Sequence, residues 1–447
     1  MKQHFFLITG LYLLLPLLPV YLFLRAAGND IPFHLVTSRI AGIYAFVWYS
    51  LQFILASRLR PVEWAASQDK RLTLHMLLAA GLLVIVLIHT GFGDEKHASR
   101  IQAGFGGTAD TVFLYATLFS ALFFTNYFIR FLPFLIPFRD KLTSLLSLTH
   151  EKCRLLHYAM PAGLLLVIVH ILLLPGNDLA VFKICMVLIA GTGLAAFSIH
   201  RFLIPRLILN HPWKVAEVIQ ESSSVTTLAF DPPAGKRFRH AAGQFCYICP
   251  LDDQFPRQFH PFTISSNPQA PRPTVTVKHV GDFTSLLKKT KPGTPVGVDG
   301  PYGKFTCRKT SPGSELVFIA GGIGITPMLS MLRDLSQEDP IRKALLIWNV
   351  RDPKDLICRE EVEALSRQMT DFIFEPVISG LGQWGGRKGR INEKLLRELL
   401  QIHGFRTKDK STTFFICGPP AMISTTASAL KTMGISGRQI HTERFAF

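Results

Sequence analysis

Acidic side chains are scarce in this sequence of 447 residues, which has 31 Asp and Glu against 48 Lys and Arg and a formal net charge of +17. Charged residues make up only 18% of the chain and hydrophobic residues 48%, which excludes an intrinsically disordered protein. Neither Gly, with 33 residues, nor Pro, with 28, is abundant enough for a collagen-like or low-complexity chain. Little charge combined with strong basicity is typical of a membrane protein with cationic loops on one side.

The apolar residues gather in long runs in the first half of the chain, whereas the second half has the mixed composition of a soluble α/β protein. The Lys and Arg residues are spread over loops rather than gathered in one patch, which disfavours a nucleic-acid binder. A length of 447 residues predicts about three domains of ~150 residues each. We therefore expect domains at residues 1–207, 208–312 and 313–447, the first of them in a membrane.

Six segments are apolar enough to cross a hydrocarbon core of ~30 Å, which takes ~20 helical residues. They are Phe5–Leu24, Ile40–Leu59, Leu72–Phe92, Thr111–Phe131, Leu155–Leu174 and Val181–Leu203. The first also resembles a signal peptide with Lys2 as its positive region, but its apolar core exceeds the usual ~7–15 residues, so we expect a retained helix.

The cations of the connecting loops indicate the orientation. Loops rich in cations alternate along the chain with loops that have few. The cations of the rich loops are Arg58, Arg60, Lys70, Arg71, Arg139, Lys141, Lys152, Arg154, Arg201 and Arg206. By the positive-inside rule both termini are cytoplasmic. We expect a multi-pass protein of the cell (inner) membrane with a cytoplasmic second half.

Histidine is rare in membrane-spanning helices, because an ionisable side chain there is costly and usually functional. The third segment has His75 and His89, and the fifth has His157 and His170. One such histidine is more often a hydrogen-bonded core residue, but two spaced pairs on non-adjacent helices favour metal ligation. At ~1.5 Å per residue the pairs are ~21 and ~19.5 Å apart, so His75 matches His157 in height and His89 matches His170.

Two imidazoles per ion are typical of a six-coordinate haem iron that passes electrons, whereas a tetrahedral zinc site needs four ligands. The angles require a distortion of the fifth helix, since thirteen residues at ~100° each leave His170 ~140° from the face of His157. Pro161 offers one, because proline frees a backbone carbonyl and kinks a helix.

With these spacings the membrane half resembles the ferric reductase and NADPH oxidase superfamily of transmembrane haem proteins, whose four-histidine pattern matches His75-x13-His89 and His157-x12-His170. The resemblance implies a six-helix α transmembrane bundle with two stacked b-type haems, in a bacterial membrane. It covers the whole chain once the second half is included.

Short strands punctuated by Pro and Gly follow residue 212 and predict a small antiparallel β-barrel domain. From residue 314 onward, strands alternate with helices, which predicts an α/β parallel-sheet domain with nucleotide binding at its carboxyl edge. The expected strands of this sheet are Leu316–Ala320, Ala344–Asn349, Phe372–Val377 and Thr413–Cys417, and the expected helices are Thr326–Leu335, Arg359–Arg367, Asn392–Ile402 and Pro420–Met433.

The run His260-Pro-Phe-Thr-Ile-Ser-Ser266 is by itself only a strand that ends in a polar turn. It resembles the flavin signature of ferredoxin-reductase-type domains, in the His-Pro-Phe-Thr form of the oxidase and ferric reductase branch; many other relatives have Arg where His260 stands. The implied FAD contacts are His260, Pro261, Phe262, Thr263 and Ser265.

A second turn, Gly281-Asp-Phe-Thr284, opens a helix whose first N–H groups either form an ordinary cap or face an anion. The resemblance implies the pyrophosphate of FAD at Gly281, Asp282, Phe283 and Thr284.

The strand at residues 316–320 leads into Gly321-Gly-Ile-Gly-Ile-Thr-Pro327 and a helix, an order that lets the backbone approach a phosphate. It is not a GxGxxG fingerprint, since Pro327 stands where the last Gly would be. The resemblance implies a nicotinamide-nucleotide site at Gly321, Gly322, Gly324, Ile325, Thr326 and Pro327, with Cys417, Gly418 and Pro419 beside the nicotinamide.

Relatives end with an acid two residues before an aromatic that covers the flavin until nicotinamide displaces it. Glu443 and Phe445 match this pattern, and Phe447 competes for the aromatic role. Cations near the ribose decide between NADPH and NADH. Arg351 is one candidate, so we expect NADPH, with NADH as the alternative; a second candidate cluster is Arg387, Lys388 and Arg390.

Cys246 and Cys249 have the spacing of a metal pair, but they lie along a predicted strand without a second pair. We interpret both as structural.

These features predict an enzyme that moves electrons from cytoplasmic NAD(P)H through FAD and two haems b to an extracytoplasmic acceptor. The acceptor is either a ferric chelate, which we favour, or dioxygen, which would yield superoxide, or a membrane or periplasmic partner protein. Arg39, expected at the outer start of the second helix, is a candidate to stabilise superoxide, a partner for a haem propionate, or a topology anchor. Gly93 stands where some animal oxidases have an extra His, and His97 is a weak substitute.

Overall fold

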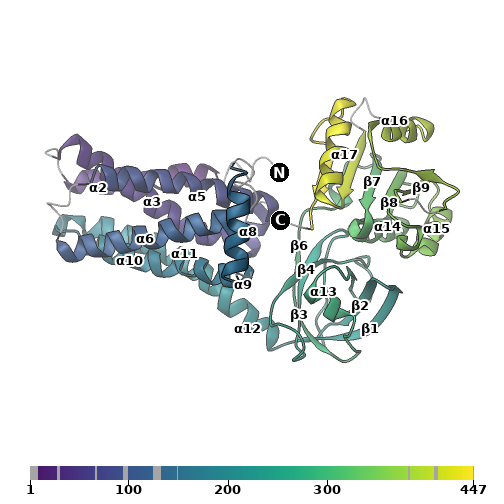
Figure 1. Cartoon of the computed structure of the whole chain (residues 1–447), viewed down its shortest axis with the longest axis horizontal. Helices are drawn as coiled ribbons and strands as arrows, with labels where there is room; N and C mark the ends of the chain where they lie inside the picture. The colour runs from purple at the N-terminus through teal and green to yellow at the C-terminus, as the bar shows by residue number, and fades with distance from the viewer. Residues whose placement is uncertain are drawn as a thin grey trace. The chain divides into compact units, whose positions relative to one another are not determined.

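A computed structural model of the chain describes residues 9–27, 31–65, 68–93, 99–123, 132–147, 150–380, 383–406 and 411–445. The chain divides into two compact units, Met1–Ile204 and Pro205–Phe447. The first is helical, and the second combines two sheets with surrounding helices (Figure 1).

The helices of the first unit and of the segment that follows it are α2 (Leu17–Ala27), α3 (Phe33–Ala56), α4 (Arg60–Ala65), α5 (Gln68–Gly91), α6 (Arg100–Phe123), α8 (Leu135–Leu145), α9 (His150–His157), α10 (Met160–Leu172), η2 (Asn177–Leu179), α11 (Ala180–Ser198), the π-helical η3 (Ile199–Leu203) and α12 (Ile204–Leu209). Five stretches of the described residues are long and apolar enough to cross a membrane: Thr9–Ala27, Phe33–Ala56, Lys70–Gly91, Leu155–Leu172 and Ala180–Leu209.

The fourth predicted span and the start of the second differ from the prediction. Helix α6 covers the beginning of the predicted Thr111–Phe131, and residues 124–131 lie outside the described part of the chain. Helix α3 begins at Phe33 rather than Ile40, so Arg39 lies within the helix and not at its start. Hydropathy excluded the polar residues before Ile40, but the helix accommodates them: Thr37 donates its hydroxyl to the Phe33 carbonyl (2.9 Å).

The helices of the first unit pack around α3, which lies against α5 and α11, while α6 lies against α10. Fully buried side chains such as Val47 and Leu164 form its core. Gly193 of α11 lies so close to α3 that a Cβ there would collide with the Ser50 carbonyl. Small residues at such crossings are typical of membrane bundles, since they let backbones approach.

The first sheet of the second unit is antiparallel, in the order β4-β3-β6-β1-β2-β5. An antiparallel bridge between Ile264 and Val275 joins the residue after β4 to β5, at the opposite end of that order. Its elements are β1 (Trp213–Ser222), β2 (Val225–Asp231), β3 (Phe245–Pro250), β4 (His260–Thr263), β5 (Thr274–Lys278), α13 (Asp282–Leu287) and β6 (Pro295–Tyr302), followed by η4 (Cys307–Lys309).

The second sheet is parallel, in the order β10-β9-β8-β7-β11-β12, as the alternating pattern predicted. Its central strands are buried on both faces, which explains their continuous apolar sequences. Its elements are β7 (Glu315–Gly321), η5 (Gly322–Ile325), α14 (Thr326–Glu338), β8 (Ala344–Val350), η6 (Pro353–Asp355), α15 (Arg359–Gln368), β9 (Phe372–Ile378), β10 (Arg387–Lys388), α16 (Glu393–Ile402), β11 (Thr412–Cys417), α17 (Pro420–Thr432) and β12 (Ile440–Glu443). The chain order reverses between β7 and β11, so ligands are expected at their carboxyl ends.

Candidate functional site

The four histidines of the first unit lie in two pairs. The ring centroids of His75 and His157 are 6.2 Å apart, and those of His89 and His170 are 6.5 Å apart. A metal–imidazole bond is ~2.1 Å long and its nitrogen lies ~1.1 Å from the ring centre, so two imidazoles on opposite sides of one ion have centroids ~6.4 Å apart. Both centroid distances therefore fit two imidazoles that would hold one ion between them.

The fifth span has the distortion that this pairing requires. Helix α9 ends at His157 and α10 begins at Met160. Between them Tyr158 N–H donates to the Leu155 carbonyl (3.1 Å), an i→i−3 bond tighter than that of an α-helix. Pro161 lies in the first turn of α10, where its missing N–H costs little. The predicted kink is thus present, just before the proline.

Hydrogen bonds orient three of the four imidazoles. Nδ1 of His89 lies 2.8 Å from the Ser38 carbonyl oxygen, and Nδ1 of His170 lies 2.9 Å from that of Gln102. A carbonyl only accepts, so Nδ1 of these two rings donates, which leaves Nε2 with a lone pair for a metal. Nδ1 of His157 lies 2.9 Å from the Ser120 hydroxyl.

Two glycines make room for the rings of His89 and His170, which we call the outer pair. A Cβ at Gly42 would lie 2.8 Å from the ring of His89, and one at Gly106 would lie 2.8 Å from Nδ1 of His170. On the same helix as Gly106, a Cβ at Gly107 would meet nothing within 4 Å. Only glycine at positions 42 and 106 therefore leaves room for the imidazole rings of the outer pair.

A cavity adjoins the outer pair, and its lining is mainly aliphatic and aromatic. The charged side chains in its lining are Arg39 and Asp110, and the Arg39 guanidinium lies 5.5 Å from the ring centroid of Phe23. Within the part of the chain that the structure describes, no group of three or more His, Cys, Asp or Glu side chains is placed to hold a metal ion. Two imidazoles and an apolar cavity fit a planar metal cofactor better than a bare ion.

In the second unit, the flavin motif and the predicted pyrophosphate turn lie together. Residues His260–Thr263 form β4, paired with β3, and the ring of His260 stacks on Phe283 with centroids 3.7 Å apart. Phe262 also lies parallel to Phe283, at 6.3 Å. The hydroxyl of Thr284 accepts from the N–H of Gly281 (3.0 Å) and so caps α13.

The other residues of these two motifs differ in accessibility. Pro261 and Asp282 are exposed, whereas Thr263 and Ser265 are buried. The hydroxyl of Ser265 lies 2.9 Å from those of Thr274 and Thr276, inside the sheet. Its predicted contact with FAD remains a prediction.

Two glycine turns meet at the reversal point of the parallel sheet. The turn after β7 includes Gly322 with a φ of +53°, and Gly418 after β11 has a φ of +156°. A Cβ on Gly324 would collide with the Cys417 carbonyl, so only glycine lets the two turns approach this closely. Ile325 and Thr326 are buried beside them, and Gly321, Pro327 and Pro419 complete the two turns.

Cys417 lies directly opposite Glu443 in the β11–β12 pairing. Burial, reinforced by the Glu443 carboxylate, raises the pKa of the Cys417 thiol well above its ordinary value, so the thiol stays neutral. Phe445 follows, half exposed at 44%, while Phe447 and His97 lie outside the described residues.

The cations that are candidates to bind the 2′-phosphate of NADPH differ in their exposure and in their ion pairs. Arg351 follows β8 and its side chain is exposed. Arg387 is paired with Glu375 (3.2 Å) and Glu398 (2.6 Å), so its charge is compensated. Lys388 and Arg390 are exposed. Because Arg387 is already paired with two acids, the group of Arg387, Lys388 and Arg390 is a weaker candidate than Arg351 for binding the 2′-phosphate.

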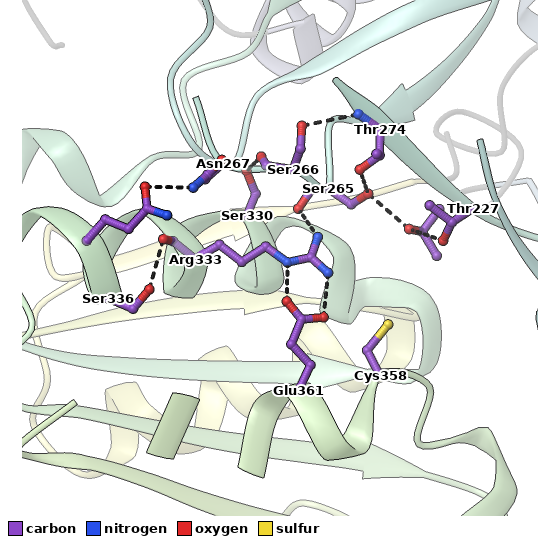
Figure 2. A network of polar contacts seen from close by, with 12 residues as sticks. Thr227, Ser265, Ser266, Asn267, Thr274, Ser330, Arg333, Ser336, Cys358 and Glu361 are labelled. Atoms are coloured by element: carbon purple, nitrogen blue, oxygen red, sulfur yellow. Dashed lines mark hydrogen bonds and ion pairs between the residues drawn. The ribbon is translucent and has the colours of Figure 1, made fainter. Parts of the chain in front are cut away.

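A polar network that the sequence patterns did not reveal joins α14 to the end of the flavin motif (Figure 2). Arg333 donates to the Ser265 carbonyl (2.6 Å) and to both carboxylate oxygens of Glu361 (2.6 Å each). Ser330 donates to the Ser266 carbonyl (2.7 Å). Gln337 accepts from the side-chain amide of Asn267 (2.9 Å). The i, i+3, i+7 spacing of Ser330, Arg333 and Gln337 was the available sequence signal, because such positions share a helix face.

The two cysteines of β3 are structural, as predicted. Cys246 and Cys249 are both buried, and residues three apart on a strand point to opposite faces.

Comparisons with known proteins match the second unit. Residues 211–306 match the FAD-binding domain family, and residues 318–428 match the oxidoreductase NAD-binding domain family. The chain is similar to ferredoxin–NADP reductase B of Sorangium cellulosum, with 31% identity over 233 residues that cover 50% of this chain and 93% of that protein.

Two further matches cover the same half of the chain. A ferredoxin NADP+ reductase of Neisseria gonorrhoeae, solved with FAD and NADP, aligns with a TM-score of 0.47 and 26% identity over 52% of this chain and 98% of that one. Reductase component 2 of terephthalate 1,2-dioxygenase from Comamonas is 27% identical over 50% of this chain and 64% of its own length.

Proposed function

Since the chain belongs, through its second unit, to the ferredoxin–NADP reductase family, we propose that it is a transmembrane flavocytochrome b that moves electrons from cytoplasmic NADPH to an extracytoplasmic acceptor. The FAD-binding and NAD-binding domains make it an oxidoreductase module of electron transfer. In this proposal the apolar helices place the first unit in the cell (inner) membrane, with both termini in the cytoplasm.

The observation that carries the proposal is the spacing of the two histidine pairs, 6.2 and 6.5 Å, in a chain that also has this reductase module. His75 and His157 would hold an inner b-type haem, and His89 and His170 an outer one. When bound, FAD converts hydride transfer into single-electron transfer and haem iron relays the electrons. The chain orients His89 through the Ser38 carbonyl and His170 through the Gln102 carbonyl, and the wall of the adjoining cavity is mainly apolar.

In the reductase module, His260, Phe262 and Thr263 would hold the flavin, and the turn at residues 281–284 its pyrophosphate. The glycine turns at residues 321–327 and 417–419 would hold the nicotinamide nucleotide. A neutral Cys417 thiol beside the nicotinamide adds no charge that would oppose hydride movement. Phe445, half exposed, would cover the flavin until the nicotinamide displaces it.

We favour a ferric chelate as the terminal acceptor over dioxygen. A cation stabilises superoxide as its charge develops, and Arg39 lines the outer cavity. Asp110 lines the same cavity, and a carboxylate there would disfavour an anion such as superoxide. Superoxide production is the second candidate, and donation to a membrane or periplasmic protein the third.

The test is NADPH oxidation by purified, FAD- and haem-loaded protein. Slow turnover in air that rises on anaerobic addition of ferric citrate is the expected result. Rapid turnover in air, with cytochrome c reduction sensitive to superoxide dismutase, would instead make it an oxidase. The variant His170→Ala should keep NADPH-dependent reduction of the flavin but lose reduction of the acceptor. Loss of flavin reduction as well would contradict the assignment of His170 to the outer site.

A further inference from the structure

Helix α8 leaves its apolar side chains exposed. None of its eleven residues is buried, and Phe138 is 57% and Leu145 74% exposed. Within the first unit, α8 runs across the direction of α5, α6 and α10 instead of along it (Figure 1). It therefore does not continue the bundle of spans.

The sequence of α8 is amphipathic. At ~100° per residue, Leu135, Phe138, Leu142 and Leu145 lie within an arc of about 80°. Two cations flank this arc, since Arg139 and Lys141 each fall about 40° beyond one of its edges. Asp140 and Ser144 lie on the opposite face. An apolar arc bordered by cations is the pattern of a helix that lies in a membrane interface.

The neighbouring segments and the charges of α8 indicate what lies against its apolar face. The apolar stretch Leu155–Leu172, which is long enough to cross a membrane, begins soon after α8 ends, so the helix lies close to the lipid surface in the proposed membrane arrangement. Of its charges, the Asp140 carboxylate lies 3.0 Å from the Arg139 guanidinium, whereas Lys141 is exposed. Its environment is thus basic and close to lipid headgroups.

We propose that α8 lies flat in the cytoplasmic headgroup layer, with its leucine and phenylalanine side chains among the acyl chains and Arg139 and Lys141 bound to anionic lipid headgroups. This inference rests on the proposed membrane location of the first unit. It commits to lipid as the occupant of the face, and not to the reductase module or a second copy of the chain. Anionic headgroups supply a counter-charge for the exposed Lys141, and they add to the one that Arg139 already has in Asp140.

Hydrogen exchange on the full-length holoprotein tests the proposal. The protein is compared in nanodiscs of phosphatidylcholine alone and of phosphatidylcholine with phosphatidylglycerol. Amides of residues 135–145 should exchange more slowly with the anionic lipid, by about fivefold for each cation engaged. The double variant R139Q/K141Q should exchange at the same rate in both.

A second pair of variants separates the two faces. Phe138→Ser with Leu145→Ser should speed exchange of α8 in both nanodiscs, whereas Ser144→Gln, on the opposite face, should leave it unchanged. Equal exchange in the two lipids would overturn the proposal.

The spans provide the reference for the membrane location itself. If peptides of α3 and α5 are protected in nanodiscs while α8 does not respond to lipid charge, only the inference about α8 fails. If the α3 and α5 peptides exchange as fast as exposed loops, the membrane location fails with it.

Discussion

At the scale of single residues, two glycines decide where the outer imidazoles lie. A residue with a Cβ at position 42 or 106, in place of Gly42 or Gly106, would bring that atom to 2.8 Å from an imidazole ring. The ring or the helix would then have to shift. Since these rings are also held at Nδ1 by carbonyl oxygens, they have little freedom to move aside. The sequence shows two glycines in apolar helices, and only the packing shows what they face.

If the outer pair holds a haem, as proposed above, Gly106→Ala should disturb that haem selectively. We expect the ratio of haem to flavin, measured as the pyridine haemochrome, to fall toward half, or the outer haem to change its midpoint potential in a redox titration. Gly107→Ala is the matched control, because a Cβ there meets nothing within 4 Å. Identical haem content and potentials in the two variants would show that Gly106 has no such role.

Arg351 is the residue on which the nucleotide preference is predicted to depend. Losing a charge-assisted hydrogen bond costs ~1.5–3 kcal/mol, so Arg351→Ser should raise KM for NADPH by roughly 10- to 100-fold. KM for NADH should change little, because NADH has no 2′-phosphate. Steady-state kinetics with both nucleotides measure the ratio.

The control for this prediction is Arg387→Ser, since Arg387 is already paired with Glu375 and Glu398. If it changes the preference and Arg351→Ser does not, the 2′-phosphate lies at the other cluster.

At the scale of elements, α14 connects the two cofactor motifs of the reductase module. Its first turn follows the glycine turn at residues 321–325, and further along it holds the chain at Ser265 and Ser266 through Arg333 and Ser330. Ser265 and Ser266 follow Ile264, the residue after the flavin strand β4, and Figure 2 shows their contacts with Arg333 and Ser330. A helix with both attachments fixes the separation of the two predicted cofactor motifs.

Arg333→Met should slow reduction of the flavin by NADPH by about tenfold or more, because charge-assisted hydrogen bonds of ~1.5–3 kcal/mol are lost. Stopped-flow measurement of flavin bleaching, with FAD affinity determined in parallel, separates positioning from cofactor loss. Arg333→Lys should restore part of the rate. Arg308→Met removes another ion pair of α14, with Asp334 (2.9 Å), that does not touch the flavin segment, and it should leave the rate unchanged.

The same scale shows where local patterns failed. Pro161 signalled a break in the fifth span, but the break lies at Tyr158 and Ala159, since the bonds that proline disrupts belong to the turn before it. Helix α3 extends back to Phe33 because its polar residues bond to the helix itself or lie within the bundle. Hydropathy measures transfer to lipid and not the capacity to form a helix.

At the scale of the whole molecule, buried thiols should lower the free energy of unfolding at alkaline pH. Burial raises the pKa of Cys307 from 9.0 to about 12, and burial also raises that of Cys246. Above about pH 9 the unfolded chain loses these protons and the folded chain keeps them, so the unfolded state binds fewer protons and stability falls as pH rises. Below pH 9 both states are protonated, and the thiols then contribute no pH dependence.

Thermal unfolding of the holoprotein, followed by flavin fluorescence at about pH 8 and about pH 10, should show this loss, at up to ~1.4 kcal/mol per pH unit for each thiol. Cys307→Ala should reduce the difference between the two pH values, even though it lowers stability at both. An unchanged difference would mean that Cys307 is not protected in the folded state.

The order of the modules, the apolar helices, the parallel sheet and the equal heights of the histidine pairs followed from the sequence alone. Hydropathy, residue periodicity and a rise of ~1.5 Å per residue are local quantities, and a linear chain records them directly. The glycine turns were predicted on the same basis, because a strand, a turn and a helix are consecutive.

Only the tertiary structure decided which side chains face one another across elements. It brought Asp110 and Arg39 to the same outer cavity, placed Gly42 and Gly106 against imidazoles, and paired Arg387 with two acids. It also showed that the Ser265 hydroxyl lies inside the sheet and that Arg333 reaches the flavin segment. Each of these contacts joins residues from different elements, so it depends on how helices and strands pack, which no local pattern in the chain records.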